Sequence, residues 1–336
     1  MRLLTMALAL LCARSASQEP NGSSDVPSAS DPQAATKPWV MEQNVTGTGK
    51  REGYGTRNGT SGVKVCGWPP NPVTVVQRIL GGKLAEEGSF PWHVLVVARG
   101  RGRASGTLIG RGWVLTAAHI FYPKGSRRID LVRQRNTTQI RLGPGTSLKA
   151  LLAEGGLEIE DIVVHPEFEE VLHNFDNDIA LIKLRTNWEE ERAMPACLPR
   201  AQEHKGRDLY QPGRVGYVAG WGIEDGFFLR DRLRYVPLPL VDQHRCWQAF
   251  QKARIGGHRP LVTTNMFCAG MPEGGRDACA GDTGGGFLVP DQRSGAWYLI
   301  GIVSWGTGCG RPGRYGVYTR VSSYLHWINS IIAAHP

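Results

Sequence analysis

Short apolar segments separated by turn-forming residues recur along most of this chain, and they constrain its fold more than any other feature. From Val65 onward, runs of four to seven strand-favouring residues alternate with clusters that contain Gly, Pro, Asn or Asp. The 43 glycines and 21 prolines fit a chain with many turns and short elements. This pattern predicts an all-β domain. The clearest runs are residues 93–97, 113–116, 179–182, 216–219, 297–303 and 316–319.

Helical periodicity is clear at one place, near the C-terminal end of the chain. Large apolar and aromatic side chains share one face there at helical spacing. A second, shorter helix is predicted over residues 241–253. The residues of the terminal helical face are Tyr324, Trp327, Ile328, Ile331 and Ile332.

Residues 1–17 have the pattern of an export signal. Arg2 supplies a positive start, residues 3–12 form a short apolar run, and the small residues at 15–17 suit cleavage near Gln18. A membrane anchor is the alternative, but it needs about 20 apolar residues, and no segment of the chain is that long. The sequence therefore predicts a secreted, extracellular protein without a membrane span.

Residues 18–64 differ in composition from the rest of the chain. They are rich in Ser, Gly, Thr, Asn and Pro and hold few large apolar residues, so they cannot bury enough surface to offset chain entropy. We expect a disordered, glycosylated tail over this range. The Asn-x-Ser/Thr sequons that predict N-glycosylation are at Asn21, Asn44, Asn58 and Asn136.

Six of the seven cysteines lie beyond the export signal, which contains Cys12. An even number in an exported protein favours three disulfides, although about fifteen pairings are open from the count alone. A zinc site is the alternative, but no Cys-x-x-Cys pair or Cys/His cluster has ligand spacing. We therefore expect no metal and no cofactor. The six cysteines are Cys66, Cys197, Cys246, Cys268, Cys279 and Cys309.

Three separated segments hold the residues with catalytic potential. They are Thr116-Ala-Ala-His119, Asp176-Asn-Asp178-Ile-Ala-Leu and Asp277-Ala-Cys-Ala-Gly-Asp-Thr-Gly-Gly285. A single histidine after a strand is more often structural or simply exposed. All three segments in this order, within one β-rich exported domain, are not expected by chance.

These segments resemble the motifs of the chymotrypsin and trypsin family of serine proteases, which has a histidine segment, an Asn-Asp-Ile segment and a Gly-Asp-Ser-Gly-Gly loop. The resemblance extends over residues 79–334. It implies a trypsin-like all-β fold of two six-stranded antiparallel Greek-key barrels with a C-terminal helix. The active site would lie in the cleft between the barrels.

The resemblance assigns roles to individual residues. His119 would be the general base, Asp178 would hold its tautomer, and Thr283 stands where the family has its nucleophilic serine. The backbone N–H groups of Gly281 and Thr283 would form the oxyanion hole. A primary pocket with an acid at its base would select Arg or Lys. The matching pocket residues are Asp277, Ser304, Trp305, Gly306 and Gly316.

The resemblance also implies activation by cleavage. Residues 65–78 would be an activation segment, cut after Arg78 so that the new Ile79 amine pairs with Asp282 and orders the oxyanion loop. The implied disulfides would keep the tail attached after this cut. They are Cys66–Cys197, Cys246–Cys268 and Cys279–Cys309.

One departure indicates a branch of the family. Most members have a cysteine directly after the catalytic histidine, bonded to one on the preceding strand, whereas Ile120 and Ala104 occupy these positions here. That absence resembles the complement-initiating proteases, including the mannan-binding-lectin-associated serine proteases, and haptoglobin. Residues 66–73, 265–270 and 301–306 look similar to the same branch.

Thr283 is the departure that decides the function. Threonine keeps the hydroxyl but adds a β-methyl group and is stiff at χ1. The methyl would crowd His119, the substrate or the oxyanion hole, and a misplacement of about 1 Å lowers a rate about a hundredfold. Two hypotheses follow: a catalytically impaired homologue that acts by binding, as haptoglobin does, or a slow endopeptidase that cleaves after Arg or Lys. The threonine favours the first.

The formal net charge of +9 is a further clue to partners. Part of it gathers in predicted loops of the first barrel, which form either a solvated face or a patch for acidic partners or sulfated glycans. We expect an extracellular protein partner or protein substrate, with a sulfated glycan as a further candidate and no nucleic acid. The clustered residues are Arg99, Arg101, Arg103, Arg127, Arg128, Arg133 and Arg135.

Overall fold

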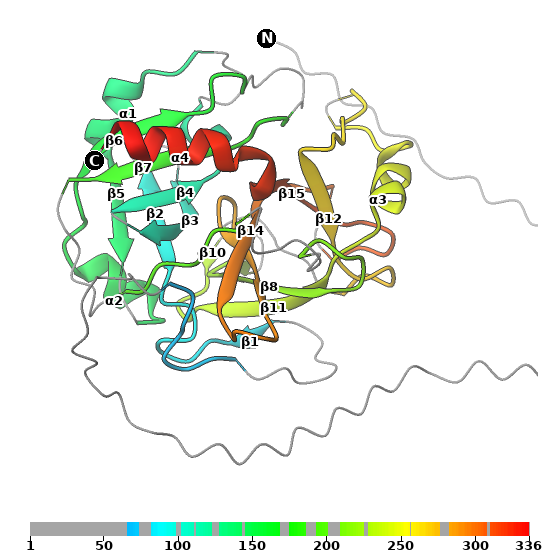
Figure 1. Cartoon of the computed structure of the whole chain (residues 1–336), viewed down its shortest axis with the longest axis horizontal. Helices are drawn as coiled ribbons and strands as arrows, with labels where there is room; N and C mark the ends of the chain where they lie inside the picture. The colour runs from blue at the N-terminus through cyan, green and yellow to red at the C-terminus, as the bar shows by residue number, and fades with distance from the viewer. Residues whose placement is uncertain are drawn as a thin grey trace, which may run out of the picture. The chain divides into compact units, whose positions relative to one another are not determined.

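Figure 1 shows the computed structural model of the chain. The chain divides into two units, residues 1–60 and 61–336, and every described residue belongs to the second. The predicted export signal and tail fall outside the described part. The structure describes residues 66–73, 82–98, 102–110, 112–122, 128–142, 145–168, 175–185, 193–200, 209–224, 228–255, 257–275, 282–307 and 310–335.

Six antiparallel strands form the first sheet, in the order β5-β2-β3-β4-β7-β6. Nearly all side chains of β2, β4 and β7 are buried, which explains why these strands are continuous apolar runs instead of alternating ones. The strands are β2 (His93–Ala98), β3 (Gly102–Gly110), β4 (Trp113–Thr116), β5 (Thr138–Leu142), β6 (Ile159–Val164) and β7 (Ala180–Leu184).

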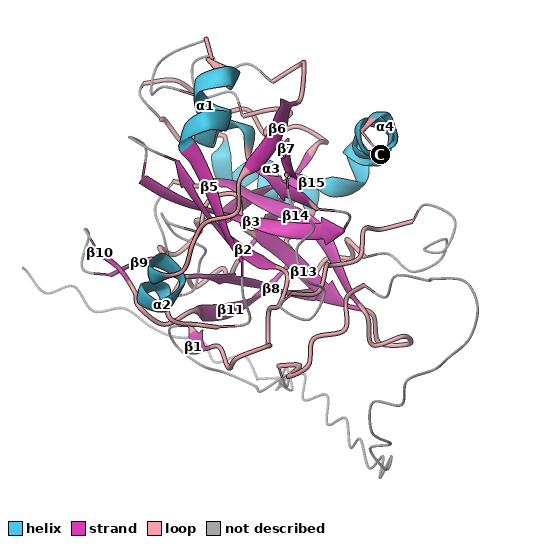
Figure 2. Cartoon of the chain, turned by 90° about the vertical axis from the view of Figure 1, so that its left-hand side faces the viewer, coloured by secondary structure: helices cyan, strands magenta, loops and turns pink. Residues whose placement is uncertain are grey.

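Seven antiparallel strands form the second sheet, in the order β1-β11-β8-β13-β14-β15-β12. The resemblance implied six, and the additional strand is β1, whose two residues pair with β11 at the sheet edge. Figure 2 shows the strands of both sheets in magenta, together with the separate pair β9 (Ile223–Glu224) and β10 (Phe228–Leu229). The strands of the second sheet are β1 (Lys83–Leu84), β8 (Val215–Gly220), β11 (Arg234–Pro239), β12 (Met266–Ala269), β13 (Gly286–Pro290), β14 (Trp297–Trp305) and β15 (Gly316–Arg320).

The two helices expected from the sequence are present with shifted bounds. α4 (Leu325–Ala334) follows the 3-10 turn η2 (Val321–Tyr324), and its side chain Ile328 is fully buried. α3 (Gln243–Phe250) begins one residue after Asp242, whose carboxylate accepts hydrogen bonds from the first turn.

Short helical elements that the sequence did not predict lie within the first sheet's connections. α1 (Leu131–Thr137) is capped by Asp130 and α2 (Leu148–Ala153) by Ser147, each through a side-chain oxygen. These caps are the signal that could have located them. The 3-10 turn η1 (Ala118–Phe121) follows β4 and contains the candidate catalytic histidine.

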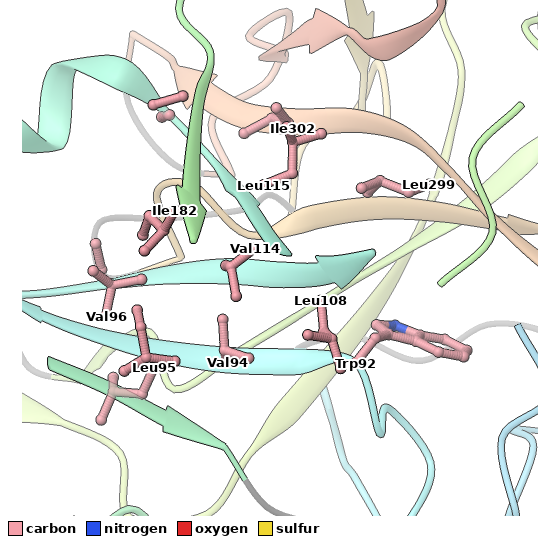
Figure 3. Packing of buried hydrophobic residues seen from close by; sticks show 14 of the residues in the cluster. Trp92, Val94, Leu95, Val96, Leu108, Val114, Leu115, Ile182, Leu299 and Ile302 are labelled. Atoms are coloured by element: carbon pink, nitrogen blue, oxygen red, sulfur yellow. The ribbon is translucent and has the colours of Figure 1, made fainter. Parts of the chain in front are cut away.

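A shared core joins the two sheets. Figure 3 shows Val94, Leu108 and Val114 of the first sheet packed in one cluster with Leu299 and Ile302 of β14. All five are at most 1% exposed, and each such side chain contributes about 1.5–3 kcal/mol relative to an exposed one. The core therefore fixes the sheets relative to each other, and with them the loops at their junction.

Two disulfides lie within the described ranges. Cys66–Cys197 connects the segment before the domain to the domain itself, and Cys246–Cys268 connects α3 to β12. Both match the pairing that the resemblance implied. The third implied pair, Cys279–Cys309, lies outside the described residues.

His93 is a buried titratable group in this core. Its side chain lies in β2 against Trp221, with ring centroids 5.0 Å apart, and its Nε2 has no hydrogen-bond partner in the described part of the chain. Burial lowers the pKa of His93 from 6.5 to about 4.

We expect this burial to make stability depend on pH. The unfolded chain takes up a proton near pH 6.5 and the folded chain only near pH 4, so the free energy of unfolding decreases as pH falls between these values. The decrease amounts to about 3 kcal/mol. Urea unfolding of wild type, His93→Gln and, as a control, the exposed His326→Gln across this range would measure it. A His93→Gln protein with an unchanged pH slope would contradict the expectation.

Candidate active site

His119 and Asp178 meet because two neighbouring strands end at the same edge of the first sheet. β4 and β7 are antiparallel, with Thr116 opposite Ala180. The residues that follow β4 and those that precede β7 are therefore adjacent. His119 Nδ1 lies 2.7 Å from Asp178 Oδ2, and the backbone N–H of His119 donates to Asp178 Oδ1 at 2.9 Å.

Asp178 also binds groups from the second sheet. Ser304 Oγ donates to Asp178 Oδ2 at 2.5 Å, and Thr319 Oγ1 donates to the backbone carbonyl of Asp178 at 2.8 Å. The carboxylate is completely buried. Burial alone would raise the pKa of Asp178, but the charge of His119 and the hydrogen bonds from His119 and Ser304 lower it below its ordinary value. Asp178 is therefore a carboxylate at neutral pH and holds the Nδ1 proton of the imidazole.

Asn177 shapes the turn that presents Asp178. It has a φ of 59°, and no other non-glycine residue in the described ranges has a positive φ. Its side-chain amide donates to the Glu167 carbonyl at 3.1 Å, and its Oδ1 accepts from the Tyr324 hydroxyl at 3.0 Å. Asparagine tolerates this left-handed conformation better than most residues. The turn is thus fixed from both sides.

The turn that contains Thr283 is held by backbone hydrogen bonds on three sides. The Thr283 carbonyl accepts from Ser105 N–H at 2.8 Å, and Gly284 N–H donates to the Val303 carbonyl at 2.9 Å. Gly285 N–H donates to the Asp282 carbonyl at 2.9 Å. A Cβ on Gly284 would lie 2.3 Å from Thr116 Oγ1. The turn therefore packs against the end of β4, directly before the segment with His119, and has little room to move.

Replacing Gly284 with alanine is expected to destabilise the protein. The new Cβ would also lie 2.4 Å from the Ser105 carbonyl oxygen, and the backbone φ of +82° is unfavourable for alanine. Overpacking and the left-handed backbone together lower the free energy of unfolding by about 3 kcal/mol or more. Urea unfolding would measure the loss. Gly145→Ala is the matched control, since a Cβ there would meet no atom within 4 Å; equal losses in the two variants would refute the expectation.

The side chain of Asp282 reaches the end of β8. Its Oδ1 accepts a hydrogen bond from Gly222 N–H at 3.0 Å. A Cβ on Gly220 would lie only 1.9 Å from the same oxygen, so glycine is required for this approach. Arg78 and Ile79, which the sequence placed in the activation step with Asp282, lie outside the described residues.

Part of the predicted substrate pocket is described. Trp305 ends β14, Gly316 begins β15, and a Cβ on Gly306 would lie 4.0 Å from the Gly316 Cα, so the two glycines face each other. Ser304 is buried, and its hydroxyl binds Asp178, a role that sequence reasoning missed. Asp277 and Gly281, the predicted pocket acid and oxyanion donor, are outside the described ranges.

A row of aromatic rings, also missed from the sequence, borders the histidine. The rings of His119 and Phe175 meet edge to face at 5.5 Å, and Phe175 stacks on Trp305 at 6.1 Å. Trp305 in turn contacts Phe250 of α3 at 4.9 Å. No motif marks Phe175 or Phe250, although Phe175 lies three residues before Asp178.

The arginine cluster is only partly described. Arg128 precedes α1, Arg133 and Arg135 lie on it, and Arg103 lies on β3, while Arg99, Arg101 and Arg127 are outside the described residues. The sequon residue Asn136 is exposed on α1. Within the described ranges, no group of three or more His, Cys, Asp or Glu residues could hold a metal ion.

The comparisons agree with this geometry. A family model described as Trypsin matches residues 79–328, and the chain belongs to the trypsin family. It is similar to haptoglobin of Oryctolagus cuniculus, with 37% identity over 281 residues, which cover 81% of this chain and 75% of that one. It is also similar to haptoglobin-related protein of Homo sapiens, with 38% identity over 285 residues, which cover 80% and 74% of the two chains. The family and the haptoglobin branch predicted from the motifs are thereby confirmed. In the described part of the chain, no helix has the length and apolar character needed to cross a membrane.

Proposed function

We propose that this chain is a secreted, trypsin-like serine protease homologue that acts by binding and has very low hydrolytic activity. The observation that carries the proposal is Thr283 in a turn that cannot adjust. Hydrogen bonds to Ser105 and Val303 hold the backbone on both sides. The additional methyl group of threonine must therefore be accommodated by the side chain alone, at the place where the reactive oxygen is needed.

The similarity to haptoglobin supports action by binding, because the resemblance to haptoglobin implies a protein that uses this fold without catalysis. An extracellular protein partner is the proposed ligand, and a sulfated glycan is a further candidate at the arginine cluster. Fold alone does not decide between these functions.

A slow endopeptidase that cleaves after Arg or Lys is the second candidate. The hydrogen bonds among His119, Asp178 and Ser304 favour it, since they orient the imidazole as a general base requires. Threonine does act as a nucleophile in other enzymes, but there the chain's own amine is the base.

Further assignments, some of them on residues outside the described ranges, belong to the same proposal. They include the export signal at residues 1–17, the glycosylated tail at 18–64, the activation segment at 65–78 with its cut after Arg78, and Asp277 at the base of the pocket. The protease-like domain, residues 79–334, would form the two barrels of the family, with β1 added to the second.

The test is hydrolysis of an arginine ester by the protein cut after Arg78, measured beside a Thr283→Ser variant. If the wild type does not hydrolyse the ester and the Thr283→Ser variant hydrolyses it strongly, the result supports action by binding. Clear turnover by the wild type supports the endopeptidase.

A further inference from the structure

A small pocket opens beside α3, on the flank of the second sheet. Its residues lie in a different segment of the chain from His119, Asp178 and Thr283. Figure 1 shows α3 in yellow next to β12, to which the Cys246–Cys268 disulfide ties it. The pocket has a volume of about 150 Å³. Pockets for small molecules begin at about 300 Å³, so this one has room for a single side chain of a partner. Its lining residues are Trp247, Phe250, Gln251, Arg259, Pro260, Leu261 and Val262.

The rim of this pocket exposes large apolar side chains. Trp247 is 46% exposed and Leu261 is 52% exposed, although large apolar side chains such as these are usually buried. Phe250, at the pocket wall, is fully buried and packs on Trp305. Exposed apolar side chains around a concave, rigid floor are typical of protein interaction sites, in which Trp and Arg contribute most of the binding energy.

The surface around the pocket is positively charged. Between residues 241 and 262 the chain has four Lys or Arg residues and one carboxylate, Asp242, which caps α3. Within the described ranges, none of the four cations is paired with a carboxylate. They are Arg245, Lys252, Arg254 and Arg259. Arg254 donates hydrogen bonds to the backbone carbonyls of Gln251 and Ala253, and its positive charge, like that of the other three, is not neutralised by a carboxylate in these ranges.

We propose that this surface, formed by α3 and residues 251–262, docks an acidic segment of a partner protein, with one apolar side chain of that segment seated in the pocket. The charge selects the acidic character of the segment, and the apolar rim and the pocket volume select a single leucine-sized anchor. Arginine suits such a role because its guanidinium binds carboxylates through two parallel hydrogen bonds. The inference rests on the proposed binding function and names the surface at which the partner would bind. Its test does not involve the candidate catalytic residues.

Binding of synthetic peptides to the intact protein tests the proposal. The first probe is a short peptide of Asp and Glu residues with one central leucine, and the second has glycine in place of that leucine. Heparin is the third probe. Calorimetry with wild-type protein should show the leucine peptide binding at least about tenfold more tightly than the glycine peptide, as one buried anchor contributes.

Two variants and two matched controls complete the experiment. Trp247→Ala and Arg259→Ala should each weaken binding of the leucine peptide about tenfold. Trp68→Ala, at a tryptophan with the same 46% exposure, and Arg293→Ala, at another exposed arginine, should leave it within about twofold. Leu261→Ala, at the exposed rim, replaces Trp247→Ala if the latter unfolds.

Several outcomes would overturn the docking surface. Equal affinity for the two peptides would show that no apolar side chain is seated in the pocket. Unchanged affinity for the leucine peptide after Trp247→Ala and Leu261→Ala would show the same. If heparin binds more tightly than the leucine peptide, and Trp247→Ala leaves the affinity for heparin unchanged, the positive charge serves to bind sulfated glycans instead. None of these outcomes bears on ester hydrolysis, so a failure here and a failure of the proposed function are distinguishable.

Discussion

The Thr283→Ser protein, cut after Arg78, should hydrolyse an arginine ester at least about a hundredfold faster than the equally processed wild type. The serine hydroxyl can face His119 without a methyl group, and the turn around it is already fixed by Ser105 and Val303. A misplacement of about 1 Å accounts for roughly a hundredfold, and complete loss of the nucleophile for about a millionfold. The gain should appear in kcat, with KM nearly unchanged, because the pocket is not altered.

This measurement requires two checks. N-terminal sequencing must find Ile79 as a new chain end, so that an unprocessed protein is not mistaken for an inactive one. His119→Ala in each background must abolish the activity, since any remaining turnover comes from a contaminating protease. Wild-type turnover comparable to that of Thr283→Ser would show that the threonine is a competent nucleophile and would refute the proposed function.

In the Thr283→Ser background, Asp178→Asn should lower kcat about ten-thousandfold, as the corresponding change does in a comparable triad. The carboxylate is completely buried and accepts bonds from the His119 ring, the His119 backbone and Ser304. An asparagine amide turned toward Nδ1 donates a hydrogen bond there, which moves the imidazole proton to Nε2. The Nε2 atom can then no longer accept the serine proton.

A nearby carboxylate provides the control for Asp178→Asn. Asp176 lies two residues earlier and accepts hydrogen bonds from Thr263 and Asn265. Asp176→Asn should change kcat less than about tenfold. Equal losses in the two variants would mean that general electrostatics, and not the tautomer of His119, limits the rate.

The sequence predicted the family and most features that depend on local pattern. His119 follows one apolar run and Asp178 precedes another, so the motifs place them beside strands β4 and β7, and α4 follows from a clear helical period. α1 and α2 were missed because six or seven residues contain too few turns to show a period. β1 was missed because two residues, one of them exposed, have no alternation to detect.

The contacts that complete the site depend on packing between the sheets, which no local pattern encodes. Ser304 was assigned to the pocket wall from its position in a motif, yet its hydroxyl reaches Asp178 because β14, which contains it, packs in one core with the first sheet. Phe175 and Phe250 are far apart in the sequence, and both contact the ring of Trp305. Their neighbourhood arises only when the two sheets and α3 are assembled.

Phe250, Trp305, Phe175 and His119 form a continuous series of ring contacts from the pocket beside α3 to the candidate catalytic histidine. Because closely packed side chains transmit strain, a ligand that displaced Phe250 would also strain Trp305. Any such coupling is reciprocal: an occupant of the cleft changes the affinity at the flank by the same factor. In a homologue with very low turnover, such coupling would let a peptide bound beside His119 alter the affinity of the surface at α3 for its partner.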